Sequence, residues 1–139
     1  MRISLITVCF NSKDSIEKTL ISVKNQNFQN FEHIIIDGNS QDNTIEIVRK
    51  FKHISKVVSE KDNGIYDAIN KGIKISEGEI IGFLNSDDTF YDSNILKIIS
   101  ESFNNKTDCV FGNLIYTDKN EKIKRKWSGS NFKTGKFKK

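Results

Sequence analysis

The fold is decided by residues 78–88, Gly-Glu-Ile-Ile-Gly-Phe-Leu-Asn-Ser-Asp-Asp, which read as a short apolar strand with an acidic tip. A run of Ile, Phe and Leu between Gly and Asp is typical of a strand buried on both faces of a sheet. The adjacent carboxylates of Asp87 and Asp88 repel each other unless a positive charge lies beside them. A divalent cation such as Mg²⁺ or Mn²⁺ prefers such oxygens. Asp88 could equally begin a turn or cap the next helix, so this stretch alone leaves both readings open.

Segments with strand character and segments with helical spacing alternate along the rest of the chain. The further expected strands are 3–10, 31–36, 56–59 and 109–116. The expected helices are 15–26, a segment carrying Ile45, Val48 and Phe51, then 65–75 and 93–103. A turn at 118–121 predicts a hairpin, with 122–127 returning antiparallel. The alternation predicts an α/β fold, with a Rossmann-like, mostly parallel sheet flanked by helices.

Polar and acidic residues follow the expected strands. In a parallel sheet, ligands bind beyond the carboxyl ends of the strands, and these ends meet at one edge. The residues expected there are Phe10 and Asn11, Asp37, Glu60 and Asp62, and then Asn85, Asp87 and Asp88. Because several acids at one edge repel one another, we expect this edge to bind a divalent cation or a donor that carries one.

Composition limits the class of protein. A chain of 139 residues can form one domain with a real core, and it has no run of 18 apolar residues. The first residues lack the pattern of a signal peptide, so we expect a cytoplasmic protein. The net charge of +4 is uneven, because residues 119–139 hold nine Lys or Arg and one acid. Such a segment can contact an anionic membrane surface, less readily nucleic acid, or can simply be solvated.

Several other functions lack their usual sequence patterns. The chain has no Gly-x-Gly-x-x-Gly, no P-loop and no Gly-x-Ser-x-Gly. Without a glycine loop for phosphate, a bound nucleotide would need a metal to neutralise its diphosphate. His33 and His53 have no ligand partner at useful spacing, and we expect both to be structural. Cys9 and Cys109 fall at opposite ends of parallel strands, so we expect two partly buried thiols and no disulfide.

Four segments together resemble the family 2 glycosyltransferases. They are Ile-Thr-Val-Cys-Phe-Asn (6–11), Ile-Ile-Ile-Asp-Gly-Asn-Ser-Gln-Asp-Asn-Thr (34–44), Asp-Asn-Gly-Ile-Tyr-Asp-Ala-Ile-Asn-Lys-Gly (62–72) and the acidic strand 78–88. The resemblance implies the GT-A fold and an inverting, metal-assisted transfer of a sugar from a nucleotide-diphosphate-sugar to a glycan or lipid-linked acceptor. It also implies work in polysaccharide biosynthesis, with the enzyme in the cytoplasm or at the inner face of the membrane.

The resemblance also implies roles for particular residues. Val8 to Phe10 would line the base and ribose pocket, with Phe10 against the ring, and Asp37 would contact the nucleoside. Asp67 and Lys71 would face the donor. Residues 85–87 fall on the Asp-x-Asp element, so Asp87 is the expected metal ligand with Asp88 beside it. The implied donor-binding set is Val8, Phe10, Asn11, Asp37, Gly38, Asp67, Lys71, Asn85, Ser86 and Asp87.

This sequence departs from the family pattern at three points. Asn85 replaces the first acid of Asp-x-Asp, and Gly38 stands where a second Asp is common, which puts the usual contact to the base in doubt. No residue reads as the general base that must deprotonate the acceptor. We therefore expect residues 1–118 to form a GT-A nucleotide-sugar-binding domain and the basic segment 119–139 to begin an acceptor half that lies beyond this chain. The alternatives are a catalytically incomplete nucleotide-sugar-binding or interaction module and, less in keeping with Asn11-Ser12-Lys13-Asp14, a nucleotidyltransferase.

Overall fold

The computed structural model describes residues 1–118 and 120–129, which form two compact units. The first unit comprises residues 1–101, and the second begins at Ser102. The first unit holds four strands, β1 (Ile3–Cys9), β2 (Phe31–Asp37), β3 (Ile54–Ser59) and β4 (Ile80–Phe83). It also holds the helices α1 (Ile16–Lys24), α2 (Thr44–Val48), α3 (Ile65–Ile75) and most of α4 (Ile95–Ser102).

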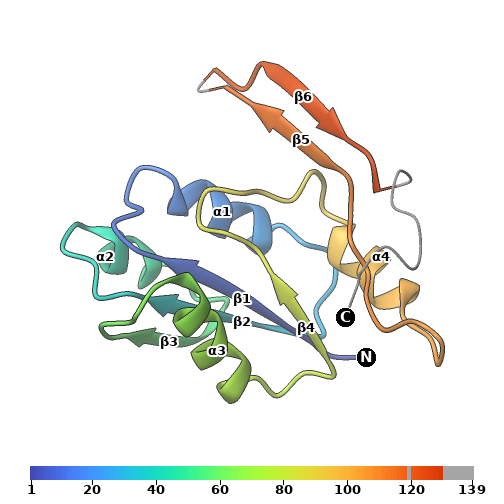
Figure 1. Ribbon diagram of the computed structural model, residues 1–139, viewed down its shortest axis with the longest axis horizontal. Coiled ribbons are helices and arrows are strands. Elements are labelled where there is room, and N and C mark those ends of the chain that lie inside the picture. The colour runs from blue at the N-terminus through green and yellow to red at the C-terminus, as the bar shows by residue number, and fades with distance from the viewer. Residues whose placement is uncertain (119, 130–139) are drawn as a thin grey trace. The chain divides into compact units, whose positions relative to one another are not determined.

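The four strands form one parallel sheet in the order β3-β2-β1-β4 (Figure 1). β1 lies in the middle, with Ile3 paired to Phe31 of β2 on one side and to Ile80 of β4 on the other. β2 pairs with β3 from His33 to Asp37, with one register shift after His33. Each connection between these parallel strands contains a helix, as parallel strands require. The α/β fold class predicted from the sequence is confirmed.

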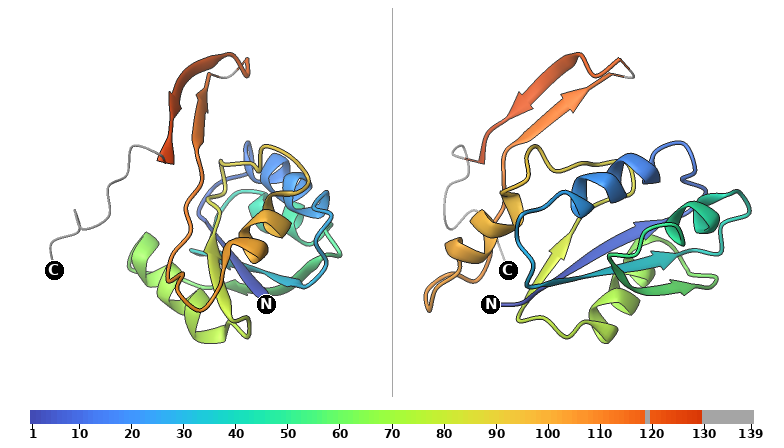
Figure 2. Two further views of the ribbon diagram at one scale, coloured as in Figure 1. Left: turned by 90° about the vertical axis from the view of Figure 1, so that its right-hand side faces the viewer. Right: turned by 180° about the vertical axis from the view of Figure 1, so that it is seen from behind.

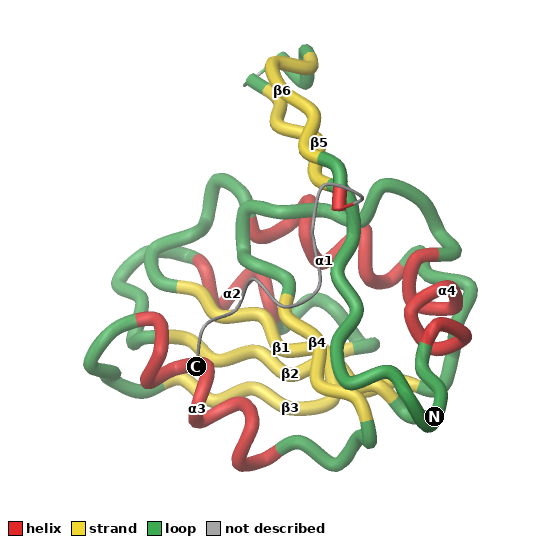
Figure 3. Tube along the Cα trace, turned by 45° about the vertical axis from the view of Figure 1, so that its right-hand side comes forward, coloured by secondary structure: helices red, strands yellow, loops and turns green. Residues whose placement is uncertain are grey.

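Helices cover both faces of this sheet. Cys9 and Ile35 point to the face covered by α1 and α2, where they pack on Ile16, Leu20 and Val48. Their strand neighbours Ile6, Ile34 and Ile36 point the other way and pack on Ala68 of α3. Figures 2 and 3 show α3 on the opposite side of the sheet from α1 and α2. β1 and β2 are therefore buried on both faces, which explains their nearly continuous apolar sequence.

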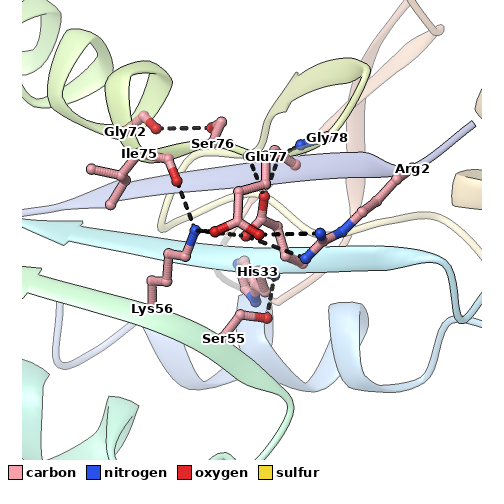
Figure 4. A network of polar contacts seen from close by, with 11 residues as sticks. Arg2, His33, Ser55, Lys56, Gly72, Ile75, Ser76, Glu77 and Gly78 are labelled. Atoms are coloured by element: carbon pink, nitrogen blue, oxygen red, sulfur yellow. Dashed lines mark hydrogen bonds and ion pairs between the residues drawn. The ribbon is translucent and has the colours of Figure 1, made fainter.

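The edge of the sheet where the strands begin is held by a buried carboxylate, Glu32, which is 1% exposed. Glu32 accepts hydrogen bonds from the Ser4 hydroxyl at 2.6 Å and from the Glu77 backbone N–H at 2.7 Å. Lys56 Nζ lies 3.2 Å from Glu32 and 2.6 Å from Glu77, and Arg2 pairs with Glu77 at 3.2 Å (Figure 4). Burial raises the pKa of Glu32, but these hydrogen bonds outweigh it and hold the pKa below its ordinary value.

The second unit contains a β-hairpin of β5 (Leu114–Thr117) and β6 (Ile123–Trp127), paired antiparallel. The predicted turn and antiparallel return are confirmed, and Asp118 accepts the backbone N–H groups of Asn120 and Lys122 in that turn. Two expectations were wrong. The strand begins at Leu114 rather than at residue 109, and it pairs only with β6 among the described residues rather than extending the parallel sheet. Both cysteines are free as expected, but Cys109 is exposed rather than partly buried.

Candidate functional site

The carboxyl ends of β1, β2, β3 and β4 lie along one edge of the sheet, because all four strands are parallel. The residues that follow them are Phe10 and Asn11, Gly38, Glu60, and Leu84 with Asn85. This arrangement, termed here the carboxyl edge, is the one that the sequence predicted. Its loops are joined across long stretches of sequence by polar contacts.

The loop after β1 is bound to the loop after β2. The Asn11 N–H donates to Ser40 Oγ at 2.8 Å, and Asn11 Oδ1 accepts the Gln41 N–H at 2.9 Å. Asn11 has a positive φ of 49°, a conformation that Asn adopts more readily than most residues. Ser12 N–H donates to the buried Thr44 hydroxyl at 2.8 Å. Asn11 is thus a structural bridge at the carboxyl edge, with both its backbone and its side chain engaged.

Asp37 at the end of β2 is completely buried. Its carboxylate accepts hydrogen bonds from the backbone N–H of Ser40 at 3.0 Å, from the Ser40 hydroxyl, and from the Ser59 hydroxyl at 2.7 Å. The Cys9 thiol lies 3.6 Å from Oδ1, and burial followed by the charge of Asp37 raises the pKa of that thiol. In this structure Asp37 joins the ends of β1, β2 and β3 and presents no exposed oxygen to a ligand.

Three residues meet beside the end of β2: Phe10, Gly38 and Asp62. Gly38 is buried, and a Cβ atom added to it would lie 2.7 Å from Asp62 Oδ2 and 3.3 Å from Phe10 Cδ2. Phe10 is 61% exposed, so its ring is accessible to a ligand. An exposed aromatic ring can stack on a planar ligand, and a carboxylate beside the ring can accept a hydrogen bond from the edge of that ligand.

Helix α3 carries Asp67 and Lys71, both predicted to face the donor. Asp67 Oδ2 accepts the Asn63 N–H at 3.0 Å, which fixes the first turn of α3. Lys71 Nζ lies 2.9 Å from Glu60 and 3.7 Å from Asp67, and it donates to the Lys61 carbonyl at 3.0 Å. Glu60 is the main reason that the pKa of Lys71 is raised, so this side chain carries a firm positive charge next to the carboxyl edge.

The loop after β4 contains Asn85, Ser86, Asp87 and Asp88. Asp88 N–H donates to the Asn85 carbonyl at 3.1 Å, which closes a turn, and the Asn85 amide group donates to Asp88 Oδ2 at 3.3 Å. Burial and then the charge of the Asp87 carboxylate raise the pKa of Asp88. Ser86 Oγ lies 3.0 Å from Ser12 Oγ, which links this loop to the loop after β1.

These residues fit a divalent cation only in part. Asp87 and Asp88 supply oxygens at an exposed position, and their mutual repulsion would be relieved by a cation. Among residues 1–118 and 120–129, however, no three His, Cys, Asp or Glu side chains are placed to hold a metal ion together. Mg²⁺ and similar ions commonly take one or two carboxylates and complete their coordination with substrate phosphates. The observed pair matches that pattern and does not match an all-protein metal site.

The structure thus places Phe10, Asn11, Asp37 and Gly38 together, and it joins Ser86 to the same edge through Ser12. Val8 lies one position before the end of β1 and packs with the cluster under α3. Ser12 was missed as a site residue from the sequence. Asp62 was expected among the acids of the carboxyl edge but not in the donor-binding set, although the absence of a side chain at Gly38 was the signal that a neighbouring residue could occupy that space.

The arrangement of a parallel sheet with acidic loops at its carboxyl edge is that of the GT-A glycosyltransferases. The model of the family named glycosyl transferase family 2 matches residues 4–139, so the chain belongs to this family. The resemblance recognised in the sequence is therefore confirmed, and so is the predicted GT-A fold.

One curated relative is an Escherichia coli protein, UDP-Glc:alpha-D-GlcNAc-diphosphoundecaprenol beta-1,3-glucosyltransferase WfaP. It is 39% identical over 89 residues, which are 62% of this chain and 35% of the relative. A similar solved structure is S. aureus TarS 1–349 in complex with UDP-GlcNAc, with a TM-score of 0.67 and 29% identity over 73% of this chain and 30% of that one. The mannosyltransferase PcManGT from Pyrobaculum calidifontis, solved with GDP-Man and Mn²⁺, shares the fold at a TM-score of 0.64 and 23% identity, over 68% of this chain and 30% of that one.

The chain spans about two fifths of the length of the curated relatives it matches. No helix among the described residues is long and apolar enough to cross a membrane. Of the basic segment 119–139, Lys119 and residues 130–139 lie outside the described residues.

Proposed function

We propose that this chain binds the donor in a nucleotide-sugar-dependent glycosyltransferase. One observation carries the proposal: the parallel sheet of a family 2 chain brings an exposed aromatic ring, Phe10, and an acidic loop, Asn85 to Asp88, to the same edge. A nucleotide-diphosphate-sugar needs both, a flat apolar contact for its base and a cation site for its diphosphate. The solved relative TarS was crystallised with such a donor, UDP-GlcNAc.

In this proposal Phe10 stacks on the base, and Val8, Asn11, Gly38 and Ser86 shape the wall around the nucleoside. Asp87, with Asp88 beside it, would hold a Mg²⁺ or Mn²⁺ ion, as PcManGT of the same fold was solved with Mn²⁺. When bound, the ion would supply positive charge for the leaving diphosphate. Asn85 can add a neutral oxygen to this site and contributes no charge.

Two charged residues of the β3–α3 region complete the donor site. Lys71 carries a raised pKa and lies in contact with Glu60 and Asp67, so its ammonium group can turn to a donor phosphate only by leaving those partners. Asp67 holds Asn63 in place and so keeps the loop shape. In this proposal Asp37 does not contact the ligand and instead positions the hydroxyl groups of Ser40 and Ser59, which donate hydrogen bonds to its carboxylate.

We further propose that the transfer is inverting and of the hexosyltransferase type. The acceptor hydroxyl oxygen would bond to the anomeric carbon as the bond from that carbon to the diphosphate breaks, and the hydroxyl proton would pass to a general base. We assign no general base for this step among residues 1–118 and 120–129, and we propose that the base belongs to an acceptor half outside them. The acceptor is proposed to be a glycan or a lipid-linked sugar, as in the E. coli relative, whose name specifies a diphosphoundecaprenol acceptor.

Calorimetry tests the donor site. The chain is titrated with UDP-, GDP- and dTDP-sugars in Mn²⁺, and binding of at least one of them is expected. Asp87→Asn should weaken that Mn²⁺-dependent binding at least tenfold, because one of the two carboxylate ligands is removed. Asp92→Asn is the matched control, since Asp92 is an exposed acid of the following loop segment and should bind like the native chain. No binding of any of the three donors contradicts the proposal.

The alternative function is a catalytically incomplete nucleotide-sugar-binding or interaction module, and the lack of an assigned general base among the described residues favours it. A turnover assay separates the enzyme from this module: sugar transfer or donor hydrolysis by the 139-residue chain excludes the incomplete module. Donor binding without turnover, followed by transfer once the chain is extended, supports the enzyme. Donor binding without turnover in both forms supports the module.

We also propose peripheral contact with a membrane, at its cytoplasmic face, through the hairpin of β5 and β6. Tyr116 and Ile123 are each half exposed there, Arg125 and Lys126 lie on the returning strand, and Lys122 directly precedes it. Basic side chains beside apolar ones suit an anionic lipid surface. Sedimentation with phosphatidylglycerol vesicles, and with neutral vesicles as the control, should show binding to the anionic vesicles only and loss of it in high salt.

A further inference from the structure

We infer that Asp62 selects the donor's base, by accepting a hydrogen bond from a ring N–H of uracil, thymine or guanine. The inference rests on the proposed donor site and assigns its base-recognising residue. It starts from the three residues that meet at the end of β2. Gly38 leaves a space beside the exposed Phe10 ring, and Asp62 Oδ2 reaches to within 2.7 Å of the point where a Cβ at position 38 would stand.

The carboxylate of Asp62 is held with one oxygen occupied. Asp62 Oδ1 accepts the Gly64 N–H at 2.9 Å. Gly64 has a φ of 109°, a conformation that residues with a side chain rarely adopt, so the turn that makes this hydrogen bond is fixed by its sequence. No hydrogen bond from the described residues reaches Oδ2. The turn therefore uses Oδ1 and leaves Oδ2 as an acceptor beside Phe10 and Gly38.

The other carboxylate at this position cannot take the same role. Asp37 immediately precedes Gly38, but it is completely buried and its oxygens accept hydrogen bonds from Ser40 and Ser59. Asp62 is half buried and approaches Gly38 from the loop after β3. Of the two acids next to Gly38, only Asp62 has an acceptor available to a ligand stacked on Phe10.

The polarity of that acceptor determines which bases it can recognise. Uracil and thymine carry an N–H at N3, and guanine carries one at N1, on the edge that is used in base pairing. Cytosine and adenine have an unprotonated ring nitrogen at the corresponding position, and its lone pair would face the carboxylate. A hydrogen bond to a charged acceptor is among the strong ones, so the preference should be about tenfold or more.

The test is calorimetric binding of UDP, GDP, CDP and ADP to the whole chain in Mn²⁺. The native chain should bind UDP or GDP at least tenfold tighter than CDP and ADP. In Asp62→Asn the amide oxygen can keep the Gly64 N–H, so the amide N–H₂ would face the base as a donor. UDP binding should weaken by about ten- to a hundredfold, and the UDP-to-CDP ratio should fall, because N3 of cytosine accepts a hydrogen bond.

Asp92→Asn is the matched control. Like Asp62 with Gly64, Asp92 accepts the backbone N–H of the residue two positions later: its Oδ1 lies 2.7 Å from the Asn94 nitrogen. Asp92, however, lies in the loop after β4. This variant should keep the native ratios. Thermal unfolding of both variants verifies that each is folded. A native UDP-to-CDP ratio in folded Asp62→Asn overturns the inference while the donor site stands, and so does a native chain that binds CDP or ADP as tightly as UDP.

A second pair of variants tests the shared space. Gly38→Asp alone should weaken UDP binding, because its Cβ would lie too close to Asp62 Oδ2. Adding Asp62→Ala removes that clash, and the Gly38→Asp substitution then supplies a carboxylate from position 38. The double variant should therefore prefer UDP over CDP more strongly than the single variant Asp62→Ala does. No regain counts against the inference. A native chain that binds none of the four nucleotides refutes the proposed function, and the inference with it.

Discussion

Lowering the pH from 7.5 to 5 should destabilise the first unit by about 2 kcal/mol, because His33 is buried in its neutral form. His33 lies in β2, and its ring is completely buried. His33 Nε2 is 3.0 Å from the Thr7 hydroxyl, and Nδ1 is 3.3 Å from His53 Nε2. A neutral ring can satisfy both contacts, with one nitrogen donating and the other accepting. Burial, and secondarily the charge of His53, lower the pKa of His33 to about 3.

The magnitude follows from proton linkage. An unfolded chain protonates this imidazole below a pKa of about 6.5, whereas the folded chain does not until the pH approaches 3. The unfolded state therefore binds more protons in this window, and the free energy of unfolding falls as the pH falls. Each pH unit below about 6.5 costs about 1.4 kcal/mol, which gives about 2 kcal/mol at pH 5. The pKa of His53 is also lowered by burial, so it acts in the same direction.

Urea unfolding followed by far-ultraviolet circular dichroism, at half-unit steps from pH 7.5 to 5, measures this effect. The midpoint should fall by about 1 M urea over that range. Carboxylates with lowered pKa, such as Glu32, lose their stabilising effect only at lower pH, so the window isolates the imidazoles. His33→Gln should be less stable at pH 7.5 but should show a clearly flatter profile. A native midpoint that does not move between pH 6.5 and 5 would refute the reasoning.

Three further changes test the packing. Gly78→Ala should lower the free energy of unfolding by about 2 kcal/mol or more, measured by thermal unfolding, because its Cβ would lie 2.6 Å from the Ser4 backbone nitrogen. Gly112→Ala, with open space around it, should be nearly neutral in the same measurement. Leu20→Ala should lower the free energy of unfolding by about 2–5 kcal/mol in urea because the side chain is fully buried, and Ile21→Ala on the exposed side of α1 should cost under about 1 kcal/mol. Asp37→Asn should cost about 2 kcal/mol, since its amide N–H₂ would face the donors of Ser40 or Ser59, and equal stability would show that these hydrogen bonds are not made.

Local pattern was enough for the elements whose sequence and environment agree. The helix predicted at 65–75 is α3, and the strand predicted at 31–36 is β2 with one more residue. The carboxyl edge followed from topology, because parallel strands end together. α2 ends at Val48 although the apolar spacing continues to Phe51, which packs on the core from outside the helix. The spacing of apolar residues indicates which side chains are buried, but it does not indicate where the backbone hydrogen bonds of the helix end.

Long-range pairing was what the sequence could not supply. The turn at 118–121 predicted the antiparallel partner of the apolar segment near residue 110, but nothing in that segment says whether it also extends the parallel sheet. His33 and His53 read as unrelated residues, and the register of β2 against β3 brings their rings into a stack with centroids 5.4 Å apart. Asp37 was predicted to contact the nucleoside. Its burial depends on two serines, one three residues away and one 22 residues away, and only the fold brings them together.

The ion-pair network of Arg2, Glu32, Lys56 and Glu77 lies at the end of the sheet opposite the carboxyl edge. This separation has a practical meaning for engineering. Libraries that randomise exposed positions of the carboxyl edge, such as Phe10 and Asp87, would leave this ion-pair network unchanged and would also spare the Asn11 contacts that join the edge loops. Fusions at the amino terminus are the riskier choice, because the Arg2 N–H and carbonyl are already hydrogen-bonded to Glu79 and Ile80.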